Sequence, residues 1–244
     1  MTRLIVWRHG QTAWNLQNRI QGQTDVALDD TGRAQAETAA RLLAGERADV
    51  LVSSDLRRAQ DTAATLAALT GLPVGQDKRL RERSYGEWEG LTHAEISARW
   101  PAEFQRWRLG EPIPECGLED PDDVAARAGA ALAEVAERVG DGTLVVVSHG
   151  GAARQGVGAL LGWPPLAVRA IGPLGNCHWS ELRGSATRGW RLQAHNVGPR
   201  AHAEPLPTAD DAVSGSAGAT GEGPGSVGGG AGSVGGTAGA SVTS

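Results

Sequence analysis

The chain has 244 residues, of which 40% are hydrophobic, and a formal net charge of −5 at pH 7. It is long enough to bury a large core, and no stretch is long and apolar enough to cross a membrane. Four acidic residues and no lysine or arginine follow residue 202, so the rest of the chain is nearly neutral. The absence of a basic run argues against nucleic acid or an anionic membrane as the main partner.

The first half of the chain alternates strand-like and helix-like stretches. Its expected elements are a strand at about 3–7, a helix near 31–44, a strand at 48–54 and a helix near 56–69. Asp55 precedes the second helix and is a candidate for its N-cap. An extended segment then runs to about Leu80.

The second half begins with a capping box from Thr92 to Glu95, which predicts a short helix, and Pro101 restarts the chain as another helix. A loop leads to Asp120 and Pro121, which signal the start of a long Ala-rich helix. The remaining expected elements are the helix at about 121–139, a strand at 143–147, a helix near 152–161 and strands around 176–182 and 190–195.

This alternation predicts an α/β fold with three α/β/α layers and a mostly parallel central sheet. The solid aliphatic run at 144–147 is typical of a central strand that is buried on both faces. We expect one catalytic domain over residues 1–203. Residues 204–244 are rich in Gly, Ser and Ala and contain GSVGG twice, which predicts a disordered tail.

Basic side chains stand where three of the expected strands end. Arg8 and His9 follow the first strand, and His149 follows the strand at 143–147. Arg57 and Arg58 follow the strand at 48–54. Because parallel strands have their carboxyl ends at one edge of a sheet, we expect these groups to meet there. Successive helical positions point about 100° apart, so only one of the two adjacent arginines faces the site.

Three kinds of site fit two histidines at strand ends: structural hydrogen bonding, a metal centre with an added carboxylate, or an anion site. Arg8 counts against a metal, because a fixed cation beside His9 repels a divalent ion, and the chain has no HxH or HxxxH spacing. Two guanidinium groups suit a tetrahedral dianion, since each offers parallel donors to phosphate oxygens. We therefore expect phosphate chemistry that uses neither metal nor cofactor.

Five motifs carry a family resemblance. They are RHGQTAWN at 8–15, LDDTGRAQA at 28–36, SSDLRRAQDTA at 53–63, LRERSYGEWEG at 80–90 and VVVSHGG at 145–151. In this order they resemble the histidine phosphatase superfamily, also called the phosphoglycerate mutase-like family. The resemblance runs from Leu4 to about Asn196. It implies an enzyme that transfers a phosphoryl group through a phosphohistidine.

The resemblance also implies a role for each matching residue. His9 corresponds to the nucleophile, Arg8 and Arg58 to the phosphate clamps, and His149 to a second histidine that binds a phosphoryl oxygen. Glu82 corresponds to the proton donor. Without the motif, it would be interpreted as one of several charged residues in a solvent-exposed stretch. Further residues expected in the phosphate pocket are Asn15, Thr12, Gln21 and Gly150.

The stretch between Glu82 and His149 is short and contains no lysine, which resembles the phosphatase branch more than the mutases with their longer basic insertion. Within that branch the sequence of these motifs is similar to that of actinobacterial glucosyl-3-phosphoglycerate phosphatases, and also to that of broad-specificity and α-ribazole phosphatases. We expect hydrolysis of a small-molecule phosphomonoester. A phosphoglycerate mutase and a non-catalytic phosphoester-binding protein are the alternatives, and the oligomeric state stays open, with a homodimer as one candidate.

Some positions depart from the family or leave two interpretations. Glu119 keeps an acidic position within a changed motif, GLED, and His178 stands where the family commonly has serine. The aromatic residues Trp88, Phe104 and Trp107 fit either a core or a wall against a sugar ring. The two cysteines, Cys116 and Cys177, lie far apart, which indicates free thiols and a cytoplasmic protein.

Overall fold

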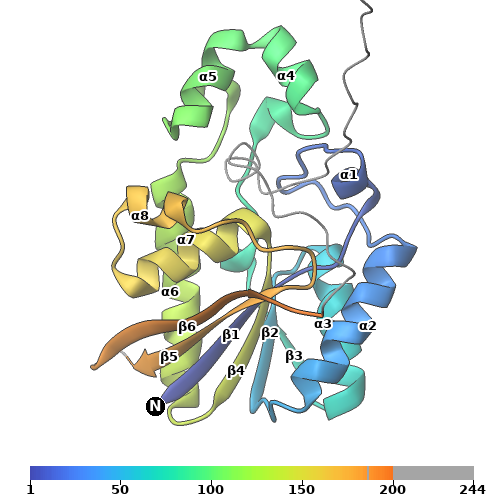
Figure 1. Cartoon of the computed structure of the whole chain (residues 1–244), viewed down its shortest axis with the longest axis vertical. Coiled ribbons are helices and arrows are strands. Elements are labelled where there is room, and N and C mark those ends of the chain that lie inside the picture. The colour runs from blue at the N-terminus through green and yellow to red at the C-terminus, as the bar shows by residue number, and fades with distance from the viewer. Residues whose placement is uncertain (186, 200–244) are drawn as a thin grey trace, which may run out of the picture.

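A computed structural model describes residues 1–185 and 187–199 of the chain. These residues form a three-layer α/β/α arrangement around one sheet, which confirms the predicted fold class (Figure 1). The domain boundary expected at residue 203 and the tail expected over 204–244 lie outside the described residues.

The sheet has six strands in the order β3-β2-β4-β1-β5-β6. The strands β3, β2, β4 and β1 run parallel, and β5 and β6 are antiparallel additions at one edge. The mostly parallel sheet is therefore confirmed, and β4 lies inside it as expected. The bounds are β1 Thr2–Arg8, β2 Val50–Ser53, β3 Val74–Gln76, β4 Thr143–Ser148, β5 Trp179–Ser185 and β6 Gly189–Val197.

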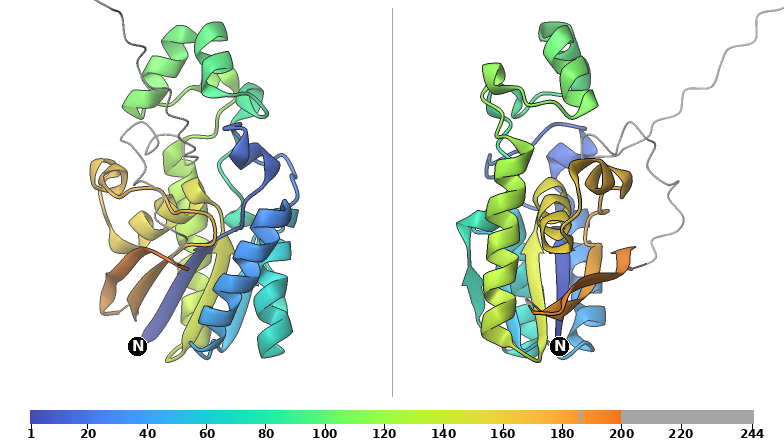
Figure 2. Two further views of the ribbon diagram at one scale, coloured as in Figure 1. Left: turned by 45° about the vertical axis from the view of Figure 1, so that its right-hand side comes forward. Right: turned by 90° about the vertical axis from the view of Figure 1, so that its left-hand side faces the viewer.

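Helices cover both faces of the sheet. On one face lie α2 (Asp30–Ala44) and α3 (Arg57–Thr70), and on the other lie α6 (Pro121–Val139) and α7 (Gly150–Leu161). The short helices α1 (Ala13–Leu16) and α8 (Pro165–Ala170) belong to the connections. Figure 2 shows α6 alongside the strands β4 and β1 when the molecule is turned by 90°.

The alternation of side chains along β1 explains the two cores. Ile5 and Trp7 point toward α2 and α3, and Leu4 and Val6 point toward α6 and α7. All four side chains are fully buried. Because successive side chains of a strand point to opposite faces, the four consecutive apolar residues 4–7 need cover on both faces, as the sequence predicts for the centre of a parallel sheet.

A helical cap rises above the carboxyl ends of the strands (Figures 1 and 2). It contains α4 (His93–Arg99) and α5 (Pro101–Leu109), with the 3₁₀ turns η2 (Gly86–Trp88) and η3 (Pro114–Cys116). Trp88 is fully buried and Trp107 is 3% exposed, and their rings pack edge to face 5.7 Å apart. These aromatic residues are therefore the core of the cap, and the hypothesis of a wall against a sugar ring is wrong for both tryptophans.

The prediction of Asp55 as an N-cap is also wrong. Helix α3 begins at Arg57, and its N-cap is Leu56, which has no side-chain capping bond. The carboxylate of Asp55 instead accepts hydrogen bonds from Nε and Nη2 of Arg81, each at 2.7 Å. A bidentate pair with a guanidinium group is stronger than a cap, so this tertiary contact determines where the carboxylate points.

The segment that we expected to be extended up to Leu80 is shorter in the structure. Strand β3 ends at Gln76, and a 3₁₀ turn, η1 (Lys78–Leu80), follows. Asp77 caps this turn by accepting a hydrogen bond from the backbone N–H of Arg79 at 2.8 Å. Two other caps were predicted and are confirmed, namely the Thr92 capping box of α4 and Asp120 before α6.

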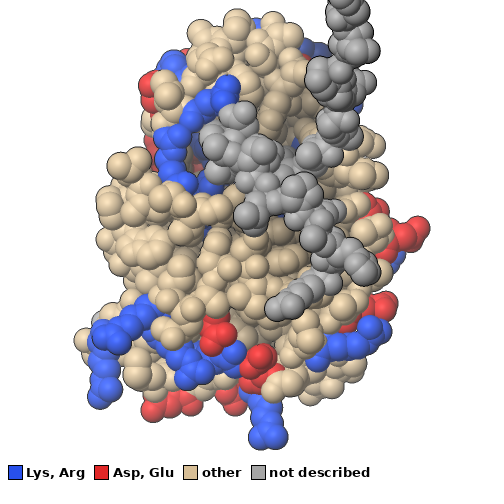
Figure 3. Space-filling model, viewed as in Figure 1, with Lys and Arg blue, Asp and Glu red and all other residues tan. Residues whose placement is uncertain are grey.

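Among the described residues, no helix has both the length and the apolar character needed to cross a bilayer. On the face seen in Figure 3, acidic and basic side chains lie mixed around the lower end of the molecule. This mixture is consistent with the nearly neutral charge of the chain before residue 203.

Candidate active site

The register of β1 and β4 brings the two histidines together. Arg8 pairs with Ser148 across these parallel strands, so His9 and His149 are the residues that directly follow this pair on the two strands. Their ring centroids lie 5.1 Å apart, and both residues are buried. This convergence at the carboxyl edge of the sheet confirms the geometric expectation drawn from the sequence.

His9 presents one ring nitrogen to a pocket. Its Nδ1 lies 2.7 Å from the carbonyl oxygen of Gly10. Because that oxygen only accepts, the neutral ring carries its proton on Nδ1 and leaves the Nε2 lone pair free. Burial first, and then the charges of Arg58 and Arg8, hold the pKa of His9 well below its ordinary value. The ring is therefore neutral at neutral pH.

The backbone after His9 needs a glycine. A Cβ atom on Gly10 would lie 2.4 Å from the carbonyl oxygen of Gly32, at the start of α2. Real Cβ atoms do not approach backbone oxygens so closely, so a larger residue would push this loop away from α2. Gly10 thus fixes the path that orients His9.

Arg58 is fully buried and faces the site. Its Nη1 and Nη2 donate to the carbonyl oxygens of Thr24 and Gly22, each at 2.8 Å. Burial lowers its pKa to about 10, which still leaves it protonated at neutral pH. The side chain of its neighbour Arg57 is 66% exposed. The expectation that only one of the adjacent arginines faces the site is confirmed.

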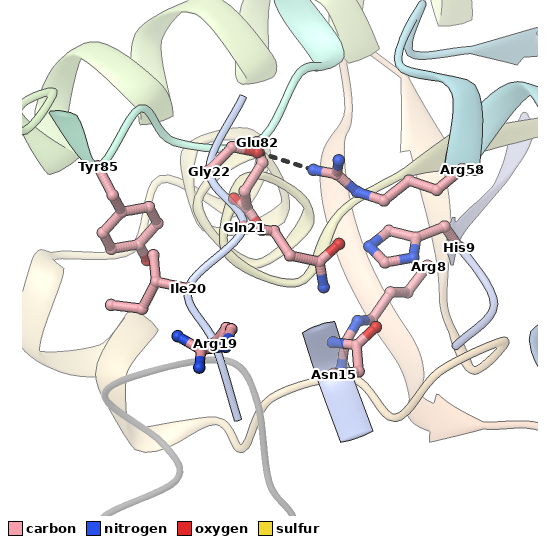
Figure 4. Close-up of a pocket in the computed structure, with 10 residues that line it drawn as sticks. All are labelled: Arg8, His9, Asn15, Arg19, Ile20, Gln21, Gly22, Arg58, Glu82 and Tyr85. Atoms are coloured by element: carbon pink, nitrogen blue, oxygen red, sulfur yellow. Dashed lines mark hydrogen bonds between the residues drawn. The ribbon is translucent and has the colours of Figure 1, made fainter. Parts of the chain in front are cut away.

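Two buried polar atoms in the pocket wall have no hydrogen-bond partner among the described residues. They are Nε of Arg8 and Oε1 of Gln21. Nη1 of the Arg8 guanidinium group donates to the carbonyl oxygen of Leu174. Figure 4 shows Arg8, His9 and Gln21 around the same space. Buried polar groups normally find partners, so these atoms indicate where a ligand would bind.

His149 lies behind this surface and is not one of the residues that line the pocket. Its Nδ1 accepts a hydrogen bond from Nε of Arg58 at 3.2 Å. The proton of the neutral ring is therefore on Nε2, which lies 2.9 Å from Oγ of Ser54. Burial and then the charge of Arg58 hold the pKa of His149 well below its ordinary value. Ser54 was not singled out in the sequence, although it stands in the SSDLRRA motif.

Glu82 lies at the N-terminus of α7. Its Oε2 accepts from the backbone N–H of Gly151 at 2.9 Å, and its Oε1 accepts from those of Ala152 at 2.9 Å and Arg83 at 2.8 Å. Free N–H groups at a helix start suit a carboxylate. A Cβ atom on Gly151 would lie 2.6 Å from Oε1 of Glu82, so this glycine makes room for the carboxyl group.

The other predicted pocket residues differ in their placement. Asn15 and Gln21 line the pocket. Thr12 does not, because its hydroxyl group forms a capping box with Asn15 and caps α1. Gly150 is buried as the first residue of α7 and does not line the pocket either. It is the next residue, Gly151, whose N–H points toward the site at Glu82.

Four of the residues that line the pocket were not predicted. Arg19, Ile20 and Tyr85 lie across the pocket from His9 and Arg58, whereas Gly22 lies next to Arg58 and accepts its hydrogen bond (Figure 4). Arg19 and Tyr85 stand in or beside the recognised motifs, but only the fold places the segments at 19–22 and 82–85 against each other. Among the described residues, no three His, Cys, Asp or Glu side chains are arranged to hold a metal ion.

Comparison with known families agrees with this geometry. Residues 4–198 match the model of the histidine phosphatase superfamily, branch 1. This chain belongs to that superfamily. The match covers all of the residues that converge at the pocket.

This histidine phosphatase resembles three proteins over most of its length. It is 40% identical to a glucosyl-3-phosphoglycerate phosphatase of Mycobacterium tuberculosis, over 84% of this chain and 98% of the relative. It is 41% identical to one of Mycolicibacterium vanbaalenii, over 80% and 94%. A structure of mycobacterial glucosyl-3-phosphoglycerate phosphatase with VO3 superposes with a TM-score of 0.75 at 42% identity, over 80% and 99%. The chain is therefore a phosphatase that acts on phosphomonoesters.

Proposed function

We propose that this phosphatase hydrolyses its substrate through a phosphohistidine formed at Nε2 of His9. The observation that carries the proposal is the hydrogen bond from Nδ1 of His9 to the carbonyl oxygen of Gly10, which leaves Nε2 as an unprotonated nucleophile in the pocket. The lowered pKa of His9 keeps that nitrogen unprotonated at neutral pH.

In the first step, Nε2 of His9 attacks phosphorus in line with the ester oxygen, so that a P–N bond forms while the P–O bond breaks. Arg8 and Arg58 bear positive charge beside the equatorial oxygens, where charge is concentrated in the transition state. Nε of Arg8 has no other partner among the described residues, so it is free to donate to one of these oxygens. His149, whose ring nitrogens contact Arg58 and Ser54, contributes by orienting Arg58.

Glu82 acts first as the general acid and then as the general base. In its acid form it donates a proton to the departing alkoxide, which leaves as the free alcohol. The resulting carboxylate then takes a proton from the water that attacks phosphorus and breaks the P–N bond. This second step releases inorganic phosphate and restores both His9 and the acid form of Glu82. Glu82 lines the same pocket as His9, as both steps require.

We propose glucosyl-3-phosphoglycerate as the substrate. The relatives that share 40% and 41% of their residues with this chain, over nearly their full lengths, bear that name. The pocket wall also contains Arg19, whose side chain is 32% exposed, and the buried Tyr85, which offer a cation and an aromatic ring to the part of the substrate beyond the phosphate. The phosphate itself fits the opposite, arginine-rich end.

A panel of phosphomonoesters tests the proposal. Glucosyl-3-phosphoglycerate, 3-phosphoglycerate, phosphoserine and p-nitrophenyl phosphate are compared by kcat/KM with and without excess EDTA, and inorganic phosphate is measured as the product. The proposal predicts that glucosyl-3-phosphoglycerate has the highest value and that EDTA leaves it unchanged. Isomerised phosphoglycerate without phosphate release would indicate a mutase instead, and binding without turnover would indicate a phosphoester-binding protein.

We also propose a cellular location and an oligomeric state for the enzyme. We place it in the cytoplasm, because Cys116 and Cys177 are both buried free thiols. We also propose a homodimer, for which the outer edge of strand β6 is the candidate contact, since β6 is the longer of the two strands that end the sheet. Cell fractionation and sedimentation analysis test the two statements separately.

A further inference from the structure

Arg127, in α6, holds the backbone of the segment that carries Glu82. Its Nη1 donates to the carbonyl oxygens of Arg79 and Arg81, each at 2.7 Å. Its Nη2 donates to the carbonyl oxygen of Glu82 itself at 2.9 Å. One guanidinium group thus satisfies three backbone oxygens within four residues of chain.

Glu119 completes this arrangement. Its carboxylate accepts from Nε of Arg127 at 2.6 Å and from Nη2 at 2.9 Å, which makes the pair bidentate. The same carboxylate accepts from the backbone N–H of Ser84 at 3.0 Å. Burial opposes its ionisation, but the hydrogen bonds from Arg127 and Ser84 outweigh burial, so the pKa of Glu119 lies below its ordinary value.

The backbone of Glu119 binds the same segment. Its N–H donates to the carbonyl oxygen of Ser84 at 2.9 Å, and its carbonyl oxygen accepts from Nε of Arg83 at 2.7 Å. The residues on both sides of Glu82 are therefore tied to α6 and to the chain that leads into it. This is a structural use for the acidic position that the sequence retains within GLED.

The Glu82 side chain is consequently fixed at both ends. Arg127 and Glu119 hold its backbone, and the N-terminus of α7 holds its carboxyl group. The side chains of Arg127 and Glu119 are 20% and 18% exposed, and neither lines the pocket. They touch the site only through the segment that carries Glu82.

We propose that Arg127 and Glu119 are positioning residues for proton transfer by Glu82. The inference rests on the proposed function of Glu82 as the proton donor. A donor has to lie within hydrogen-bond reach of the departing oxygen, and a displacement of about 1 Å can cost on the order of 100-fold in rate. A planar, bidentate guanidinium group fixes direction as well as distance, which an ammonium group does not.

The test uses Arg127→Lys and two substrates that differ in their need for a proton. p-Nitrophenyl phosphate releases a stabilised anion without protonation, whereas 3-phosphoglycerate releases an alkoxide that requires it. Lysine keeps the charge but cannot reach three carbonyl oxygens and a carboxylate together. We expect the ratio of kcat/KM for 3-phosphoglycerate to that for p-nitrophenyl phosphate to fall about tenfold or more. Glu119→Gln should lower the same ratio.

A matched control lies at the other end of the sheet. Arg3 donates from Nε and Nη2 to the carboxylate of Glu181 at 2.7 and 2.9 Å, and these side chains are 19% and 18% exposed. Arg3→Lys and Glu181→Gln therefore remove a pair of the same geometry and burial without touching the Glu82 segment. We expect both control variants to leave the substrate ratio unchanged, whatever they do to the melting temperature.

Glu82→Gln separates the inference from the function on which it rests. This variant should lower the substrate ratio further. Arg127→Lys should cause no additional loss in the Glu82→Gln background, because both changes remove the same contribution, proton transfer by Glu82. If Glu82→Gln lowers the ratio but neither Arg127→Lys nor Glu119→Gln does, the inference alone is overturned. If Glu82→Gln leaves the ratio unchanged, the proposed role of Glu82 fails and the inference fails with it. Should Arg127→Lys not fold, Glu119→Gln decides.

Discussion

Nε of Arg58 donates to Nδ1 of His149 over 3.2 Å, so that one of the two site arginines is oriented by one of the two site histidines. The contact joins the start of α3 to the end of β4, segments that the sequence separates widely. It determines which nitrogen of His149 carries the proton, and it leaves the remaining N–H groups of Arg58 for backbone oxygens and for a ligand. The charge and position of the Arg58 guanidinium group and the tautomer of the His149 ring therefore depend on one another.

Removing Arg58 should abolish most of the activity. We expect Arg58→Ala to lower kcat/KM for p-nitrophenyl phosphate by about 100- to 1,000-fold, the usual effect of losing one donor to a transition-state oxygen. The matched control is Arg57→Ala, because Arg57 is exposed and pairs with Asp61 on the surface of α3. Equal losses in the two variants would contradict the assignment of Arg58 to the phosphate.

The pH dependence of kcat/KM should reflect His9. Its pKa lies well below the ordinary value of about 6.5, because of burial and of the charges of Arg58 and Arg8. Protonation inactivates the nucleophile, so activity should hold as pH falls through 6.5 and decline only at lower pH. In Arg58→Gln one charge is removed, so the acid limb should move up toward 6.5. An acid limb at 6.5 in the parent enzyme, after correction for ionisation of the substrate, would contradict this prediction.

Gly151→Ala should impair the reaction through Glu82. The added Cβ would lie 2.6 Å from Oε1 of Glu82 and would displace the carboxyl group. We expect kcat for 3-phosphoglycerate to fall by up to about 100-fold, with a smaller loss for p-nitrophenyl phosphate, because only the former needs a proton donor. Gly172→Ala serves as the control, since a Cβ at Gly172 meets no atom within 4 Å. Equal kcat values in the two variants would show that Glu82 needs no such room.

The sequence predicts the parts of this site that local pattern and sheet topology determine. Apolar runs locate β1 and β4, and the rule that parallel strands end at one edge brings His9 and His149 together. Helical spacing predicts that only one of Arg57 and Arg58 faces the site, and the resemblance of the SSDLRRAQDTA motif assigns Arg58. Capping chemistry locates the starts of α4 and α6, because Thr92 and Asp120 satisfy backbone groups within their own segments.

Contacts between distant segments could not be predicted in this way. Asp55 has the pattern of an N-cap, but Arg81 reaches it from another segment and forms the stronger bond. In the sequence, Arg127 is one of several charged residues on an amphipathic helix. Only the packing of α6 shows that it donates to the backbone carbonyl oxygen of Glu82. Thr12 is a different case, because the family resemblance places it in the pocket, whereas its hydroxyl group forms a local cap of α1 with Asn15.

The most direct test of the central claim is to trap the enzyme during turnover, quench it with denaturant at alkaline pH, and map phosphorylated peptides by mass spectrometry. Phosphohistidine is predicted on His9, lost on acid treatment, and absent from His9→Ala, whose hydrolysis should be reduced to background. A trapped phosphoryl group on any other residue, or a His9→Ala enzyme as fast as its parent, would contradict the assignment of His9 as the nucleophile.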